Sequence, residues 1–377
     1  MASINPDLTK EIQSYGTVDF SSCYSCGNCT AICELSDENT FFPRNLIRFG
    51  MLGMKEEILS SKELWLCYGC GECSETCPRE SEPGDYVAAL RRYAIAHYEP
   101  TGLTKLMFRN PFAFIAITIA IALILFLFLM TMKPDHDVSR WIFNLLPFDV
   151  VHDLGMYIFI FVGIIAVFGI YKMLKGISKR NTKKVQDRTE GLMRKSWKAL
   201  VKTVNELITM NRYKECDRQD DAYWAPKPWF VKPWFVHWMI MMGFLGLLLA
   251  TILDFILKDP ATDIWLPSRI LGTITGLMMM YGASLAIYYR LTKPTHFYAR
   301  SSLADWFFLL FIWLAGLTGF WLEAAVTFHA DSVTNQVMFI IHTVISMELV
   351  LLLIFSKFAH AVYRPVALFL HYLNDSE

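Results

Sequence analysis

Six long apolar runs constrain the fold of this chain more than any other feature. A membrane-spanning helix needs about 20 apolar residues, and each run reaches or approaches that length with almost no charge. One such run could be a buried core helix, but six in succession predict a membrane domain. Hydrophobic residues make up 54% of the chain, more than an average soluble protein carries. The expected spans lie at about residues 111–132, 154–172, 233–256, 270–290, 305–326 and 334–362.

Lysine and arginine predict how these spans are oriented. The loop 173–232 is strongly basic, whereas the loops on the opposite side carry few positive charges. Because basic loops stay in the cytoplasm, both termini are expected there, in an inner-membrane protein with no secretory signal peptide. Within this loop, residues 191–210 have the pattern of an amphipathic helix that contacts membrane lipid. That reading is preferred to nucleic-acid binding, since basic cytoplasmic loops and an interfacial helix account for the positive charge.

Two cysteine boxes precede the spans, each with the pattern C-x2-C-x2-C-x3-C. This spacing is typical of two-cluster ferredoxins, whereas structural zinc sites use separated C-x2-C pairs. Glu34 stands where the second box has Pro78, a small departure from the ferredoxin pattern. The boxes therefore predict two [4Fe–4S] clusters. The cysteines are Cys23, Cys26, Cys29 and Cys33 in the first box, and Cys67, Cys70, Cys73 and Cys77 in the second.

In two-cluster ferredoxins the fourth cysteine of each box ligates the other cluster. Crossed ligation is therefore expected here, with Cys77 completing the first cluster and Cys33 completing the second. The segments between and after the boxes have helical spacing of apolar residues. The predicted fold class is all-α: a cytoplasmic helical 2x[4Fe–4S] ferredoxin-like domain (1–105) followed by a six-helix transmembrane cytochrome b bundle (106–377).

Ionisable residues within spans are functional candidates. His342 and His360 lie eighteen residues apart on the expected sixth span. Eighteen residues make five helical turns, so both rings would share one face, about 27 Å apart along the axis. This spacing suits haem b groups at opposite membrane surfaces, each needing a second axial ligand.

Candidate partner histidines come from other spans. His237 is expected at the same depth as His360, which favours this pair for the cytoplasmic haem. For His342 the partner is expected to be His152, with His329 in reserve. Glu348 would lie about 240° around the helix from His342. It is a weak candidate for proton transfer near a quinone, and a paired structural carboxylate is an equal alternative.

Two known families resemble parts of this sequence. The span of His237, the segment "YYRLTKPTHFYARSSLAD" and the His342/His360 spacing resemble the membrane cytochrome b subunit of respiratory nitrate reductase. That family carries two histidines ten apart on the matching helix, and Leu247 stands at the second position here. The resemblance therefore implies one haem b, with two possible. "CGNCTAIC" and "LWLCYGCGECSETCPRE" resemble the iron–sulfur C subunit of heterodisulfide reductase.

Joined in this order, the halves look like the membrane-embedded C subunit of the quinone-interacting membrane-bound oxidoreductase complex. The resemblance implies menaquinone as substrate, soluble flavin/iron–sulfur subunits as partners, and electron exchange with adenylylsulfate reductase. The expected function is electron transfer between menaquinol and these soluble partners. The alternatives are the membrane subunit of a heterodisulfide reductase-like or sulfite-reductase-linked complex, and a non-catalytic redox-sensing anchor. A transporter would leave eight thiols unexplained.

Overall fold

The computed structural model describes residues 4–16, 19–36, 41–132, 141–181, 192–219, 223–257, 267–299 and 301–374. Within these ranges every regular element is a helix, so the all-α prediction is confirmed. The six expected spans are also present as helices long and apolar enough to cross a membrane.

The N-terminal part is a set of short helices around one long helix, α7. The side chains of Tyr86, Leu90 and Tyr93 on α7 are fully buried, so this helix forms the centre of the small core. The short helices that follow the two cysteine loops, α2 and α6, contact each other, and α6 also packs against α7. The elements are α1 (Leu8–Gln13), η1 (Phe20–Ser22), α2 (Asn28–Ala31), α3 (Arg44–Met51), α4 (Lys55–Leu59), α5 (Glu63–Leu66), α6 (Glu72–Glu75), α7 (Pro83–Tyr98) and α8 (Leu103–Arg109).

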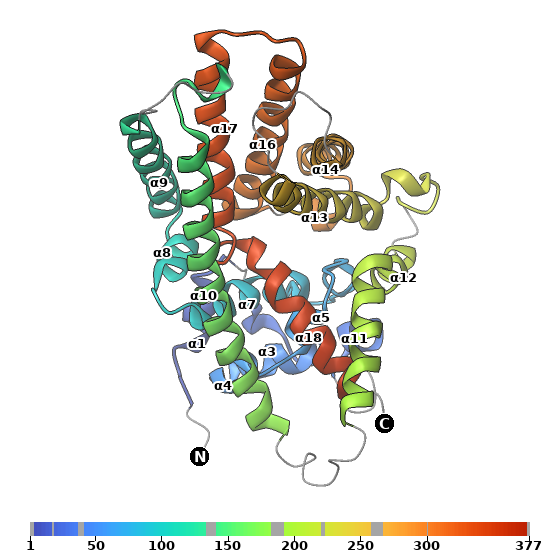
Figure 1. The fold of residues 1–377 in the computed structure, drawn as a ribbon. Coiled ribbons are helices and arrows are strands. Elements are labelled where there is room, and N and C mark those ends of the chain that lie inside the picture. The colour runs from blue at the N-terminus through green and yellow to red at the C-terminus, as the bar shows by residue number, and fades with distance from the viewer. Residues whose placement is uncertain are drawn as a thin grey trace.

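The membrane helices are apolar over most of their surface, and large side chains such as Phe112 and Ile124 are exposed. Such surfaces suit contact with lipid rather than water. In Figure 1, α9, α10, α16 and α17 run in similar directions, whereas α13 and α14 cross them. The spans are α9 (Pro111–Thr131), α10 (Phe148–Asn181), α13 (Pro233–Leu257), α14 (Pro267–Thr292), α16 (Leu303–Thr327) and α17 (Val333–Leu351), with η2 (Trp141–Phe143) before α10 and α15 (His296–Ala299) after α14.

Small residues let α13 and α14 approach closely. A Cβ atom added to Gly243 would lie 2.7 Å from the Thr275 carbonyl oxygen, and one added to Gly282 would lie 2.7 Å from the Val236 carbonyl oxygen. Packing of this kind is a common device between membrane helices. It fixes the backbone next to His237, which follows Val236 on α13.

The described parts of the expected loop 173–232 (173–181, 192–219 and 223–232) are largely helical. Helix α10 continues to Asn181, and α11 (Leu192–Thr209), α12 (Asn211–Gln219) and η3 (Trp229–Val231) follow. Helix α11 lies beside α18 (His360–Asn374), as Figure 1 shows. The proposed contact of residues 191–210 with lipid stays a prediction.

The prediction of one continuous sixth helix over 334–362 is wrong. Helix α17 ends at Leu351, a turn and η4 (Lys357–Ala359) follow, and α18 starts at His360 in a new direction (Figure 1). Ser356 adopts an extended conformation, and its hydroxyl accepts a hydrogen bond from the Phe358 amide. Lys357 forms an ion pair with Asp305 on α16. The local hydrogen bond of Ser356 and the tertiary ion pair of Lys357 override the helical pattern. His342 and His360 therefore lie on separate helices and do not share one helical face.

Candidate redox centres

The first thiol group surrounds a small cavity of about 20 Å³ lined by Cys23, Cys26, Cys29 and Cys77. Cys77 therefore lies with the first three cysteines of the other box. Gly27 has φ +90°, a conformation that favours glycine. It lets the chain turn sharply between Cys26 and the short helix α2, which carries Cys29.

The second thiol group repeats this construction. Gly71 has φ +95° and precedes α6, which carries Cys73. Burial raises the pKa of Cys33 to about 12, and the neighbouring thiols of Cys67 and Cys70 add to the effect. Cys33 thus lies beside the second box, as crossed ligation requires, although ligation itself stays a prediction. Because iron binds thiolates, cluster insertion must displace protons from these thiols.

A cavity of about 1150 Å³ connects the second box to the membrane helices. Cys67, Tyr68, Gly69 and Gly71 of the second box line it, and so do His237 and His360. The structure therefore brings the predicted pair His237/His360 together, and it places this pair next to the second box.

The two imidazole rings have a spacing suited to one shared metal atom. Their centroids are 6.2 Å apart, with 55° between the ring planes. Each histidine–metal bond is about 2 Å, and each ring centre lies about 1 Å behind its nitrogen, so two ligands on opposite sides of one metal have centroids about 6 Å apart.

Hydrogen bonding leaves nitrogen atoms free for such a role. His360 Nδ1 donates to the Lys357 carbonyl at 2.8 Å, so its Nε2 carries the lone pair. His237 Nδ1 is buried without a hydrogen-bond partner. Burial holds the pKa of His360 well below its usual range, so this imidazole is neutral, which is the form that binds metals.

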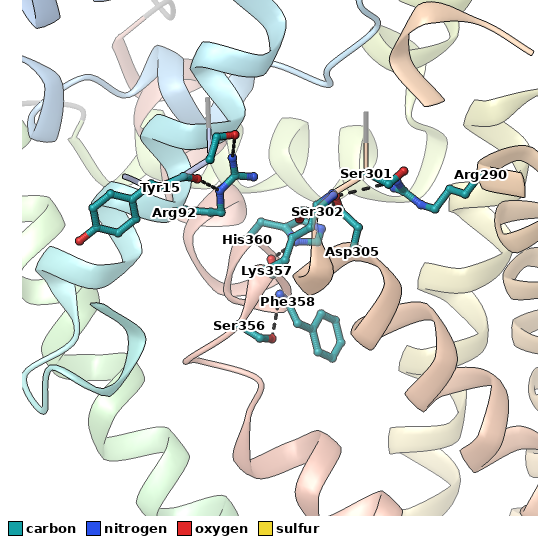
Figure 2. Close-up of polar contacts among 11 residues, drawn as sticks. Tyr15, Arg92, Arg290, Ser301, Ser302, Asp305, Ser356, Lys357, Phe358 and His360 are labelled. Carbon is teal, nitrogen blue, oxygen red and sulfur yellow. Dashed lines mark hydrogen bonds and ion pairs between the residues drawn. The ribbon is translucent and has the colours of Figure 1, made fainter. Parts of the chain in front are cut away.

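The sequence did not predict the cluster of charged side chains that surrounds the turn before His360. Lys357 pairs with Asp305, whose other carboxylate oxygen accepts hydrogen bonds from the Ser302 amide at 2.9 Å and the Ser302 hydroxyl at 2.8 Å. Arg290 lies 3.9 Å from Asp305 and donates to Ser301. Figure 2 shows these groups converging on the turn before His360. The cluster joins α14 and α16 to η4, and so fixes the carbonyl that orients His360.

An aromatic contact series also went unpredicted. Tyr68, next to Cys67, stacks on Tyr213 with centroids 5.0 Å apart. Tyr213 meets the ring of His237 edge-on at 5.9 Å. The Tyr68 hydroxyl donates to Glu206 at 2.8 Å, which fixes the stack. Packed side chains therefore connect the second cysteine box to the histidine pair.

The structure does not bring His342 to either expected partner. Its ring contacts Thr318 (Nδ1 to Oγ1, 2.8 Å) and Ser346 (Nε2 to Oγ, 3.5 Å). His152 pairs with Asp153 at 3.0 Å, and His329 is exposed. Both nitrogens of His342 thus have protein partners, so this site fits a haem less well than the His237/His360 site.

Glu348 is buried, and its Oε1 has no hydrogen-bond partner. An unpaired carboxyl in a membrane helix is costly if ionised. Proton transfer near a quinone and a structural role for Glu348 both stay predictions.

Comparison with known sequences divides the chain between two families. Residues 19–81 match the 4Fe-4S dicluster domain, and residues 105–377 match Citrate utilization protein B. The chain belongs to the Citrate utilization protein B family. This match covers the membrane half, for which the expected resemblance to the nitrate reductase cytochrome b subunit stays a prediction.

The N-terminal part of this Citrate utilization protein B family member is similar to subunits of heterodisulfide reductases. The C subunit of the H(2):CoB-CoM heterodisulfide,ferredoxin reductase of Methanothermobacter thermautotrophicus is 33% identical over 92 residues, covering 24% of this chain and 50% of that protein. The iron-sulfur C subunit of the CoB--CoM heterodisulfide reductase of Methanopyrus kandleri is 32% identical over 99 residues, covering 24% and 52%. The chain spans about half the length of these curated relatives. No solved structure matches.

These comparisons confirm the expected likeness to the C subunit of heterodisulfide reductase and support two [4Fe–4S] clusters. Six apolar helices are consistent with a multi-pass membrane protein. The chain therefore combines a 4Fe-4S dicluster domain with helices that suit a membrane, as expected of a membrane-associated iron–sulfur electron-transfer protein.

Proposed function

We propose that this subunit passes electrons between menaquinol in the membrane and a soluble redox partner, using one haem b and the two clusters. His237 and His360 would hold the haem. One observation carries the proposal: a single cavity is lined both by the second cysteine box and by this histidine pair. Carriers held at these two sites would be close neighbours, as one-electron transfer requires.

The residues of the cavity fit this role. The spacing of the two rings and the free Nε2 of His360 would suit binding of the haem iron by both residues. Phe244, Phe308 and Phe358 give the cavity an apolar wall, as the flat face of a porphyrin needs. When bound, haem b supplies a carrier that accepts and donates one electron. The chain itself holds the ligand rings in place through the Lys357 carbonyl and the α13–α14 contact.

The similarity to heterodisulfide reductase subunits indicates the chemical class of the soluble partner and does not identify one protein. Flavin/iron–sulfur subunits of the same complex are proposed, because the N-terminal half is similar to a subunit of heterodisulfide reductase. The family match over residues 105–377 favours a partner in citrate utilisation, whereas adenylylsulfate reductase is the partner implied by the sequence resemblance. Reconstituting the purified chain with each candidate, and measuring menaquinol-dependent reduction of that partner, decides between them.

Replacing Asp305 by Asn is expected to destabilise the protein and loosen the haem. Breaking a buried ion pair costs about 3–5 kcal/mol. Here the cost should be smaller, about 1–3 kcal/mol, because 43% of the Lys357 side chain is accessible. Thermal unfolding and haem retention in detergent measure the effect. Asp153→Asn is the control, since Asp153 is 61% exposed. Equal behaviour of the two variants would show that the cluster does not support the site.

Replacing His342 by Ala is expected to leave the haem content unchanged. Its ring is held by Thr318 and Ser346, and the cavity with the histidine pair does not include it. The measurement is haem per chain by pyridine haemochrome absorbance, with His329→Ala as the control. A fall in haem content in His342→Ala alone would establish a second haem at this histidine.

A further inference from the structure

Two half-buried arginines converge on the second cysteine box. Arg364 on α18 donates to the Cys67 carbonyl oxygen at 2.7 Å, and Arg91 on α7 donates to the same oxygen. Arg91 is also held by the Leu64 carbonyl at 2.8 Å. The guanidinium of Arg364 lies over the ring of Tyr68, 4.5 Å from its centroid. Helix α7 of the N-terminal half and helix α18 of the C-terminal half thus both contact the carbonyl group of Cys67, a proposed cluster ligand.

This arrangement favours an anion close to the Cys67 peptide, in addition to Glu206, which accepts a hydrogen bond from the Tyr68 hydroxyl. Like charges that share an acceptor repel each other, and the acceptor is a neutral carbonyl that compensates neither of them. Arg364 Nε is also buried without a hydrogen-bond partner. An iron–sulfur cluster ligated by thiolates carries net negative charge and would balance the two guanidinium groups. Reduction adds a further negative charge to it, so nearby cations stabilise the reduced form.

We propose that Arg364 and Arg91 raise the reduction potential of the cluster bound by Cys67, and make it the cluster that exchanges electrons with the membrane site. Arg364 lies four residues after His360 on α18, which is about one helical turn. Helix α18 therefore carries both His360, a proposed haem ligand, and Arg364, which donates a hydrogen bond to the cysteine loop at Cys67. The effect on potential needs only the cluster, whereas the exchange with haem rests on the proposed function.

The test is a redox titration of membranes, with the two cluster signals followed by electron paramagnetic resonance. Arg364→Gln is expected to shift one cluster signal to a more negative midpoint potential and to leave the other unchanged. Arg91→Gln should shift the same signal in the same direction. Arg364→Lys keeps the positive charge and should shift it less. Arg48→Gln, which removes an exposed arginine on α3, is the control.

Cys70→Ser identifies the signal of the second cluster. No shift in either glutamine variant, equal shifts of both clusters, or a shift no larger than that of Arg48→Gln would overturn the inference. If Arg364→Gln fails to assemble the cluster, the Arg91→Gln titration decides alone. Haem absorbance is recorded on the same samples. Wild-type protein without haem would refute the proposed function while the cluster shift still tests the role of the arginines.

Discussion

Replacing His237 or His360 by Ala is expected to remove the same haem and to leave both iron–sulfur signals intact. The ring centroids of His237 and His360 are 6.2 Å apart, so both residues would hold the same haem and loss of either would release it. Haem per chain should fall to background in each single variant and fall no further in the double variant. Haem absorbance and cluster resonance, measured on the same membranes, test this.

His97→Ala is a matched control for these variants. His97 is half-buried, and its Nδ1 contacts the Tyr93 carbonyl, but it does not line the cavity shared by the histidine pair. It should keep full haem content. Full haem content in both His237→Ala and His360→Ala would refute the assignment. Parallel loss of haem and cluster signals would indicate general unfolding instead.

Replacing Cys77 by Ser is expected to damage the cluster held by Cys23, Cys26 and Cys29. The reason is spatial, because Cys77 lines the same small cavity as these three thiols. The cluster bound through Cys67 should persist, although Cys77 belongs to that box in sequence. Quantified resonance signals in the variant and wild type provide the measurement.

Two reference variants make this result interpretable. Cys26→Ser should remove the first cluster signal, and Cys70→Ser the second. Cys33→Ser should match Cys70→Ser, as the mirror image of Cys77→Ser. Loss of the second signal in Cys77→Ser, with the first retained, would show that each box ligates its own cluster.

Much of the architecture was predictable because it depends on local patterns. The helical class, the six apolar spans and the two boxes follow from periodicity, length and cysteine spacing. The association of His237 with His360 was also expected, but the reasoning behind it was partly wrong. It assumed that His360 continues the helix of His342, whereas α17 ends at Leu351.

That break could not be predicted from its own sequence, which is apolar and helical in pattern. It is stabilised by Asp305, 52 residues away in sequence from Lys357. One local signal was present in the break itself, since Lys357 is an isolated charge next to an apolar run. Ser302 and Asp305, which form a capping box, mark only the start of α16. The arginines on Cys67 are equally non-local, because Arg364 is 297 residues from it.

The measurement that tests the central claim most directly is a menaquinol-reduced minus oxidised spectrum of the purified chain, with iron, sulfide and haem quantified per chain. The account predicts two [4Fe–4S] clusters and one haem b, with menaquinol reducing the haem in wild type and not in His237→Ala. A preparation with both clusters but no haem absorbance, or a haem that menaquinol does not reduce, would contradict it.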